Sequence, residues 1–370
     1  MNISRLFSLA RVVCAVSILV IVGLPAESAP ATSRTRSSVE RTPGSQKLTL
    51  KKKKVTTTRT TAARTTAART TAARTTAARA TASVKARQLK EAQQPHFKFD
   101  DSGALVPDIR AEAAIIYDPK TGQVLWEQNS TDQRSIASIT KVMTATVVLE
   151  DPNVDLTTPI VVDRSDVRAA STTYLRAGYQ VTRDDLLHLL LIGSDNAAAR
   201  ALARTSPMGA EGFVKRMNEK AAELGLQTTS YADPSGLLNA NVSSAYDLAR
   251  LISYVSGNER ISSIMRTPTY TVRAGRTTIN VSSTNQLVRV GDVDVQAGKT
   301  GFIRSSGYCL ATLLKMPQGG PDLAFVVLGA KSNAGRFWET RHLFNWLAGK
   351  AESLVGDTVE AKTPAPATNN

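Results

Sequence analysis

A five-residue repeat, Thr-Thr-Ala-Ala-Arg, runs from Thr56 to Ala82 and limits where this chain can build a core. Five residues advance an α-helix by about 500°, so successive arginines would spiral around it and no apolar face would form. Four adjacent lysines at residues 51–54 add to the charge. We therefore expect residues 32–90, which we call the basic arm, to be a disordered and self-repelling linker that extends to about residue 100.

The net charge of +15 belongs to this arm. Residues 32–90 hold 16 basic residues and one acid, whereas residues 91–370 hold 28 basic and 29 acidic residues. A neutral globular part argues against a DNA-binding face, and we expect no specific nucleic-acid partner. Two interpretations of the arm stay open, a tether to anionic envelope polymers or lipid head groups and a solubilising spacer.

The N-terminus has the three parts of a secretory signal. Arg5 and Arg11 precede an apolar run of 13 residues, Val12–Leu24, which is short for a membrane span. Residues 29–31, Ala-Pro-Ala, fit the cleavage pattern better than residues 26–28 do. We expect residues 1–31 to be a signal peptide and the protein to be exported to the periplasm. An uncleaved anchor, and association with the inner membrane or cell wall, stay open.

The rest of the chain predicts one layered domain at residues 101–350 and a disordered tail at 351–370. Strands are expected at 113–117, 123–127, 268–274, 277–282, 293–298, 308–315 and 322–330. Helices are expected at 138–148, 183–193, 209–224, 243–256 and 334–348, the fourth capped by Ser243 or Ser244. Helices bracketed by strands indicate an α/β or α+β fold, with one antiparallel sheet built from both chain ends.

Cysteine and histidine usage argues against metal chemistry. The two cysteines, Cys14 and Cys309, cannot form a disulfide framework, and Cys309 on an apolar strand is expected to be a core residue. The three histidines lie far apart, without a short metal-ligand spacing, and His188 is expected to be a core or edge residue. We expect no metal and no cofactor.

Ser138 and Lys141 open the first helix with a spacing of three. This spacing places both side chains on one helical face, close enough to exchange a proton. A desolvated lysine has a lowered pKa and can act as a neutral base. The pattern occurs by chance about once in a chain of this size, and a surface serine near a surface lysine is the default interpretation.

Two further motifs follow. Residues 194–196, Ser-Asp-Asn, come after an apolar helix and also fit an N-cap for the next helix. Residues 299–301, Lys-Thr-Gly, end a predicted strand, where the lysine can hold a carboxylate and the glycine allows close approach. A second Lys-Thr-Gly at residues 120–122 follows Asp118 and Pro119, and we assign it to a tight turn.

The order and spacing of these motifs are the specific signal. Ser194 follows Ser138 by 56 residues, and Lys299 follows Ser194 by 105. This trio resembles the active-site serine penicillin-recognising enzymes. The surrounding blocks are similar to the low-molecular-mass penicillin-binding proteins, the serine-type D-alanyl-D-alanine carboxypeptidases and endopeptidases, at residues 136–145, 233–237, 241–243, 267–270, 297–302 and 307–310. The blocks at 241–243, 267–270 and around Cys309 most resemble the endopeptidase branch, typified by penicillin-binding protein 7.

The resemblance implies a β-lactamase/transpeptidase-like fold with an all-helical subdomain, and an acyl-enzyme mechanism on peptidoglycan stem peptides. It implies that Ser138 is the nucleophile, Lys141 the general base, Ser194 the proton relay and Asn196 the orienting residue. It implies substrate binding by four residues of one strand, in which Lys299 and Thr300 hold a carboxylate, Gly301 admits substrate, and the Phe302 N–H joins that of Ser138 in the oxyanion hole. β-Lactams would be covalent inhibitors.

Four functions remain open from the residues. A D,D-endopeptidase that cuts D-alanyl–meso-diaminopimelyl cross-links is favoured over a D,D-carboxypeptidase that uses the same residues. A β-lactamase would need a deacylating Glu in a Glu-x-x-Leu-Asn motif. The segment most similar to this motif begins at Glu223, which we expect on a helix surface, so a β-lactamase is disfavoured. Asp195, in contrast, matches the β-lactamase form. A non-catalytic envelope-binding protein is the fourth. Arg304 could contact a substrate carboxylate or face solvent.

Overall fold

The computed structural model describes residues 79, 81–84, 86–87, 90–91 and 93–360. The predicted signal peptide, nearly all of the basic arm and the last ten residues lie outside them. No helix in this described part is long and apolar enough to cross a membrane.

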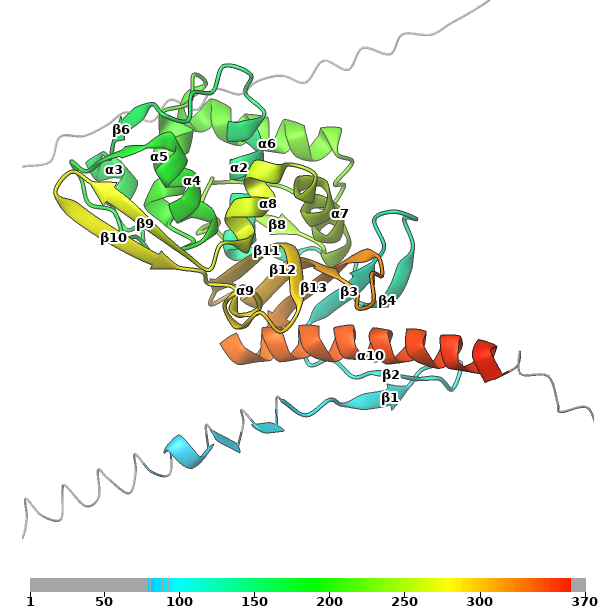
Figure 1. Cartoon of the computed structure of the whole chain (residues 1–370). Helices are drawn as coiled ribbons and strands as arrows, with labels where there is room; N and C mark the ends of the chain where they lie inside the picture. The colour runs from blue at the N-terminus through cyan, green and yellow to red at the C-terminus, as the bar shows by residue number, and fades with distance from the viewer. Residues whose placement is uncertain (1–78, 80, 85, 88–89, 92, 361–370) are drawn as a thin grey trace, which may run out of the picture. The chain divides into compact units, whose positions relative to one another are not determined.

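A five-stranded antiparallel sheet is the centre of the fold, in the order β11-β12-β13-β3-β4 (Figure 1). Its strands are β11 (Asp294–Ile303), β12 (Gly307–Lys315), β13 (Asp322–Ala330), β3 (Ala113–Tyr117) and β4 (Val124–Gln128). Because β13 pairs with β3, the two ends of the domain meet in the middle of the sheet, which confirms that prediction. β11 is longer than predicted and carries residues 299–301 within the strand.

The sheet is covered on both faces, and its residues alternate accordingly. Ile115 and Val326 belong to the core on the side of α7 (Ala245–Ser256), whereas Ile116 and Phe325 pack with Phe337 of α10 (Asn333–Glu360). This period of two is the expected pattern for a strand buried on both sides. α10 runs along one face of the sheet (Figure 1). It continues through residues 351–360, which we had assigned to the tail.

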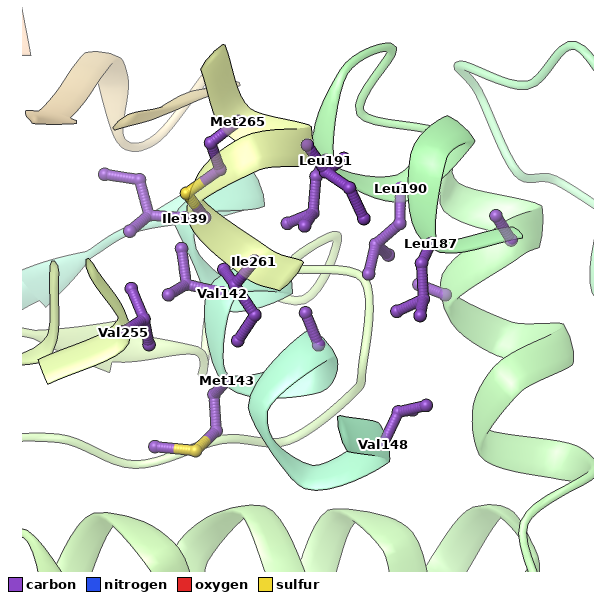
Figure 2. Close-up of a cluster of buried hydrophobic side chains, with 14 of the residues drawn as sticks. Ile139, Val142, Met143, Val148, Leu187, Leu190, Leu191, Val255, Ile261 and Met265 are labelled. Atoms are coloured by element: carbon purple, nitrogen blue, oxygen red, sulfur yellow. The ribbon is translucent and has the colours of Figure 1, made fainter. Parts of the chain in front are cut away.

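Four helices form the other main part of the domain: α2 (Lys141–Leu149), α4 (Arg183–Leu191), α5 (Asn196–Arg204) and α6 (Gly209–Glu223). α2 lies at their centre, and its residues from Lys141 to Val148 are all buried. Figure 2 shows Ile139, Val142 and Met143 packed with leucines of α4 and with Ile261 and Met265. This packing fixes the position of the turn that precedes α2. The antiparallel sheet and the helical group together confirm the predicted fold class.

Short elements connect these layers. They are η1 (Ala137–Thr140), α3 (Arg164–Val167), α8 (Glu259–Arg266), α9 (Gln286–Val290), and the strand pairs β1 (Phe97–Phe99) with β2 (Leu105–Pro107), β5 (Arg134–Ser135) with β8 (Val242–Ser243), β6 (Pro159–Val161) with β7 (Gln180–Thr182), and β9 (Thr269–Ala274) with β10 (Thr277–Ser282). β1 lies in residues that we had assigned to the linker. Ser244, one of the two predicted caps, caps α7 by accepting the N–H of Asp247 at 3.1 Å.

Candidate active site

Ser138 lies in the single turn η1, at the point where the chain enters α2. The preceding residue, Ala137, has a φ of +48°, a left-handed conformation that is costly for a residue with a side chain. The turn is held by the backbone of Ile136, whose N–H donates to the carbonyl of Asn241 at 3.1 Å. Ser138 is half-buried, so its hydroxyl is fixed and still reachable. Strained backbone held by packing is typical of functional sites.

Two glycines allow this turn to be surrounded by backbone. A Cβ on Gly236, which has a φ of +80°, would lie 2.0 Å from the carbonyl oxygen of Ala137. A Cβ on Gly301 of β11 would lie 2.6 Å from the carbonyl oxygen of Ile136. Gly301 therefore allows the close approach of the turn that carries Ser138, and it also lines the cleft described below.

Lys141 is completely buried beneath Ser138. Its ammonium lies 2.9 Å from the Ser138 Oγ and 2.6 Å from Asn196 Oδ1, and it also donates to the carbonyl of Ser235. No carboxylate is among these hydrogen-bond partners. Burial lowers the pKa of Lys141 from 10.5 to about 7, against the opposing charges of Asp233 and Asp195. A large share of this side chain is therefore a neutral amine at neutral pH.

Residues 194–196 serve the fold and the cleft at once. Asp195 caps α5 by accepting the N–H of Ala198 at 2.9 Å, as the alternative interpretation of this motif predicted. Ser194 has a φ of +58°, and Asn196 is fixed by donating to the carbonyl of Ala170 at 2.7 Å. The cap thereby turns the residues on either side of Asp195 toward Lys141 and the cleft.

Lys299 approaches the same cleft from the sheet. Its ammonium is buried and donates to the Ser194 Oγ at 2.8 Å and to the carbonyl of Thr300 at 2.9 Å. Burial, followed by the charges of Lys141 and Arg336, lowers the pKa of Lys299 well below its ordinary range. The structure thus brings the three motifs together through two lysines, each bonded to one serine hydroxyl.

A cleft of about 400 Å³ lies over these groups. Its lining includes seven of the residues just discussed or predicted: Ser138, Ser194, Asn196, Thr300, Gly301, Phe302 and Arg304. Lys141 and Lys299 are not part of this lining. Lys299 reaches the cleft through its hydrogen bond to Ser194. Phe302 is half exposed and stacks on Tyr308 with ring centroids 4.2 Å apart.

Arg336 and Thr284 also line the cleft, and the sequence did not reveal them. Arg336 is buried and donates to the carbonyls of Gly301 and Cys309 at 2.9 and 3.2 Å. The Thr284 hydroxyl lies 2.6 Å from that of Thr300. Arg336 lies 35 residues after Gly301 on a separate helix, and no local spacing signals it.

Four residues for which the sequence predicted no catalytic role have structural roles. Lys120 lies in a turn, where the Asp118 carboxylate accepts its backbone N–H at 2.8 Å. The second Lys-Thr-Gly therefore belongs to a turn. Glu223 ends α6 on its surface and pairs with Arg216. His188 is buried, donates its Nδ1–H to the carbonyl of Asp184 at 2.9 Å and stacks on Tyr270. Cys309 is buried, and burial raises the pKa of its thiol.

Within the described residues, no three His, Cys, Asp or Glu side chains come close enough together to hold a metal ion.

The fold and these motifs define a class of enzyme. A family model described as D-alanyl-D-alanine carboxypeptidase matches residues 100–332, and the chain belongs to this family of serine-type D-Ala-D-Ala peptidases. It is 36% identical over 246 residues to a D-alanyl-D-alanine endopeptidase of Pseudomonas aeruginosa, covering 66% of this chain and 79% of that protein. It is 33% identical over 252 residues to a D-alanyl-D-alanine endopeptidase of Escherichia coli, covering 65% of this chain and 78% of that protein. The crystal structure of a Streptomyces DD-transpeptidase matches with a TM-score of 0.60 and 27% identity, covering 65% of this chain and 97% of that one.

Proposed function

We propose that Ser138 is the acylating nucleophile and that Lys141 is its general base. The observation that carries this proposal is the 2.9 Å contact between the Lys141 ammonium and the Ser138 Oγ, in a position where Lys141 is fully buried. A neutral amine at this distance can accept the hydroxyl proton as Oγ bonds to the scissile carbonyl. Asn196 holds the amine in place by accepting one of its hydrogens.

Ser194 is proposed to pass the proton onward. Its hydroxyl is bonded to the Lys299 ammonium, which leaves the hydroxyl able to donate to a leaving amine on the side of the cleft. As the C–N bond breaks, the leaving amine takes the Ser194 proton, Ser194 regains a proton from Lys141, and an ester to Ser138 remains. Water then attacks the ester, and Lys141 accepts a proton from this water and gives it to the Ser138 Oγ as the ester C–O bond breaks. The net reaction uses one water for each peptide bond that is cut.

The substrate is proposed to lie along β11. The N–H groups of Ser138 and Phe302 form the oxyanion hole, which supplies hydrogen bonds where negative charge develops. The Thr300 hydroxyl meets a carboxylate beside the scissile bond. Lys299 donates to the backbone carbonyl of Thr300, and Arg336, which also lines the cleft, donates to that of Gly301. This assignment refines the sequence expectation, because Lys299 acts through Ser194 and Thr300 instead of lining the cleft itself.

We propose a D,D-endopeptidase that cuts D-alanyl–meso-diaminopimelyl cross-links between stem peptides. The two endopeptidase relatives, at 36% and 33% identity over most of their length, support this choice. The alternative is a D,D-carboxypeptidase, which the family model's description favours and which would use the same residues on a terminal D-alanine. The surface position of Glu223 disfavours a β-lactamase. β-Lactams are proposed as slowly released covalent inhibitors.

The protein is proposed to act in the periplasm, since the apolar run at residues 12–24 has the form of an export signal. The basic arm is proposed to contact anionic envelope polymers or lipid head groups. Its charge is the support for this contact, and retention of the arm on purified cell walls at low but not at high salt is the expected result.

Two measurements test the proposed function. First, the full mature chain and a Ser138→Ala variant are incubated with a fluorescent penicillin, and stable labelling of the wild type alone is expected. Second, both proteins are given purified cross-linked muropeptide dimers and uncross-linked pentapeptides, with products separated by chromatography. Release of monomers from dimers identifies an endopeptidase, whereas release of D-alanine alone identifies a carboxypeptidase. Absence of labelling of folded wild-type protein would refute the acylation mechanism.

A further inference from the structure

A second cavity adjoins the catalytic cleft at the end of β11. It has a volume of about 400 Å³ and shares Phe302 and Arg304 with the cleft. Its other walls come from the turn between β11 and β12 and from the end of β13. We call this cavity the side pocket. It has no part in the acylation chemistry described above.

The side pocket has a built floor and wall. The pairing of β12 with β13 shifts register between Tyr308 and Leu310, a bulge of the kind often found beside active sites. Gly329 lies at this irregularity with a φ of +75°, and a Cβ there would lie 2.5 Å from the Cγ of Glu112. The stacked rings of Phe302 and Tyr308 form one wall. Glycine on the floor and aromatic rings on the wall leave room for an aliphatic chain.

The charges around the side pocket are three cations and one acid. Glu112 pairs with Lys331, and its Oε2 lies 3.9 Å from the Arg134 Nη2. The hydrogen bond from Lys331 and its charge lower the pKa of Glu112, which is therefore ionised at neutral pH. Arg304 is exposed, and it makes no hydrogen bond or ion pair with the rest of the described chain. Arg304 therefore lines both cavities with a charge that no side chain of the described residues pairs.

We propose that the side pocket binds the side chain of a diaminopimelate residue in the acyl-donor stem peptide, with Arg304 receiving its free carboxylate and Glu112 its free ammonium. This inference rests on the proposed function. If the D-alanyl carbonyl lies at the Phe302 N–H, the preceding residue lies one Cα step of about 3.8 Å away, toward Arg304. Diaminopimelate in that position carries one ammonium and one carboxylate on the end of an aliphatic chain. The pocket offers aromatic rings and glycines along which the aliphatic chain can lie, and both countercharges.

The test compares three cross-linked dimers in which the donor D-alanine is bonded to an acceptor diaminopimelate and the donor residue before this D-alanine differs. One has diaminopimelate, one has lysine, which lacks the side-chain carboxylate, and one has diaminopimelate with that carboxylate amidated. kcat/KM for cleavage of the cross-link is measured with the full mature chain, with Arg304→Gln and with the matched control Arg289→Gln, an exposed arginine of α9 outside both cavities.

The wild type and the control are expected to favour the free carboxylate about fivefold over both other donors, and Arg304→Gln is expected to reduce this ratio to below twofold. An N-acetylated diaminopimelate donor should lose a similar factor with the wild type and less with Glu112→Gln. Equal rates for all donors, in wild-type protein that is labelled by penicillin, would overturn the side pocket and leave the proposed function intact. A ratio retained in Arg304→Gln would also overturn it. Wild-type protein that is neither labelled nor active would refute the proposed function, and the side pocket with it.

Discussion

The proposed role of Lys141 as the base predicts that its protonation sets how fast Ser138 is acylated at each pH. With a pKa of about 7, about half of this side chain is neutral at pH 7. With the ordinary value of 10.5, only about one molecule in 3,000 would be neutral. Burial therefore increases the amount of usable base about 1,500-fold at neutral pH.

The expected profile follows from this ionisation. The second-order rate constant for acylation by a fluorescent penicillin should rise about tenfold per pH unit at acidic pH and level off above about pH 8, because only the neutral amine accepts the serine proton. At pH 5 it should be about one hundredth of the plateau value. Stopped-flow measurements from pH 5 to 9 at constant ionic strength give the inflection directly.

A charge variant identifies the titrating group. The negative charge of Asp233 raises the pKa of Lys141, so Asp233→Asn, which keeps an oxygen for the backbone N–H groups of Ser235 and Gly236, should move the inflection to lower pH. Circular dichroism shows whether the variant is folded across the range. A flat profile between pH 5 and 8, or an inflection near the ordinary lysine value, would refute the assignment of Lys141 as a buried neutral base.

Three further predictions concern stability, each followed by urea unfolding. Gly236→Ala should destabilise the fold by about 3 kcal/mol, because the added Cβ overlaps the carbonyl of Ala137, whereas Gly275→Ala, which also has a positive φ but open space, should cost about 1 kcal/mol. Ser244→Ala should cost about 1 kcal/mol through loss of the α7 cap, and an unchanged midpoint would contradict that role. Burial raises the pKa of Glu339 from 4.5 to about 7, so the native state holds this proton more tightly than the unfolded chain does. The free energy of unfolding should therefore fall by about 3 kcal/mol as the pH rises through this window, and Glu339→Gln should remove that dependence.

The sequence predicted the sheet well because strands buried on two faces leave a continuous apolar signal. β3 and β13 of that sheet have the predicted bounds. β10, which pairs with β9 outside the main sheet, also has them, and its alternate residues are buried. α8 was not predicted, since it has eight residues and only three apolar side chains among Ser, Arg and Glu. α5 was predicted only through the N-cap interpretation of residues 194–196.

The candidate site shows a different limit. Ser138, Lys141 and Lys299 could be proposed because each stands in a short motif with a known chemical use. The carbonyl of Ser235 that holds Lys141 could not, because every residue has a backbone carbonyl and only the fold selects one. Arg336 could not either, since its partners are carbonyls of β11 and β12 that are distant in sequence. Sequence spacing detects reacting groups better than it detects the groups that position them.

The two acids nearest Lys141 act on it through their charge and not through a direct ion pair. Asp233 and Asp195 both lie near enough for their charges to act on Lys141, yet neither is hydrogen-bonded to it. The Asp233 oxygens are taken by the N–H groups of a tight loop, and the Asp195 oxygens by the cap of α5 and by Thr173.

A direct ion pair would have raised the pKa of Lys141 and left it protonated at neutral pH. With the carboxylates occupied by backbone donors, the lysines have only hydroxyl, amide and carbonyl oxygens as partners. These neutral acceptors compensate only partly for burial, so Lys141 can lose its proton. The same loops that fix the backbone around Ser138 thus keep the proposed base able to lose its proton, and this coupling explains why strained and buried polar groups are concentrated around one serine.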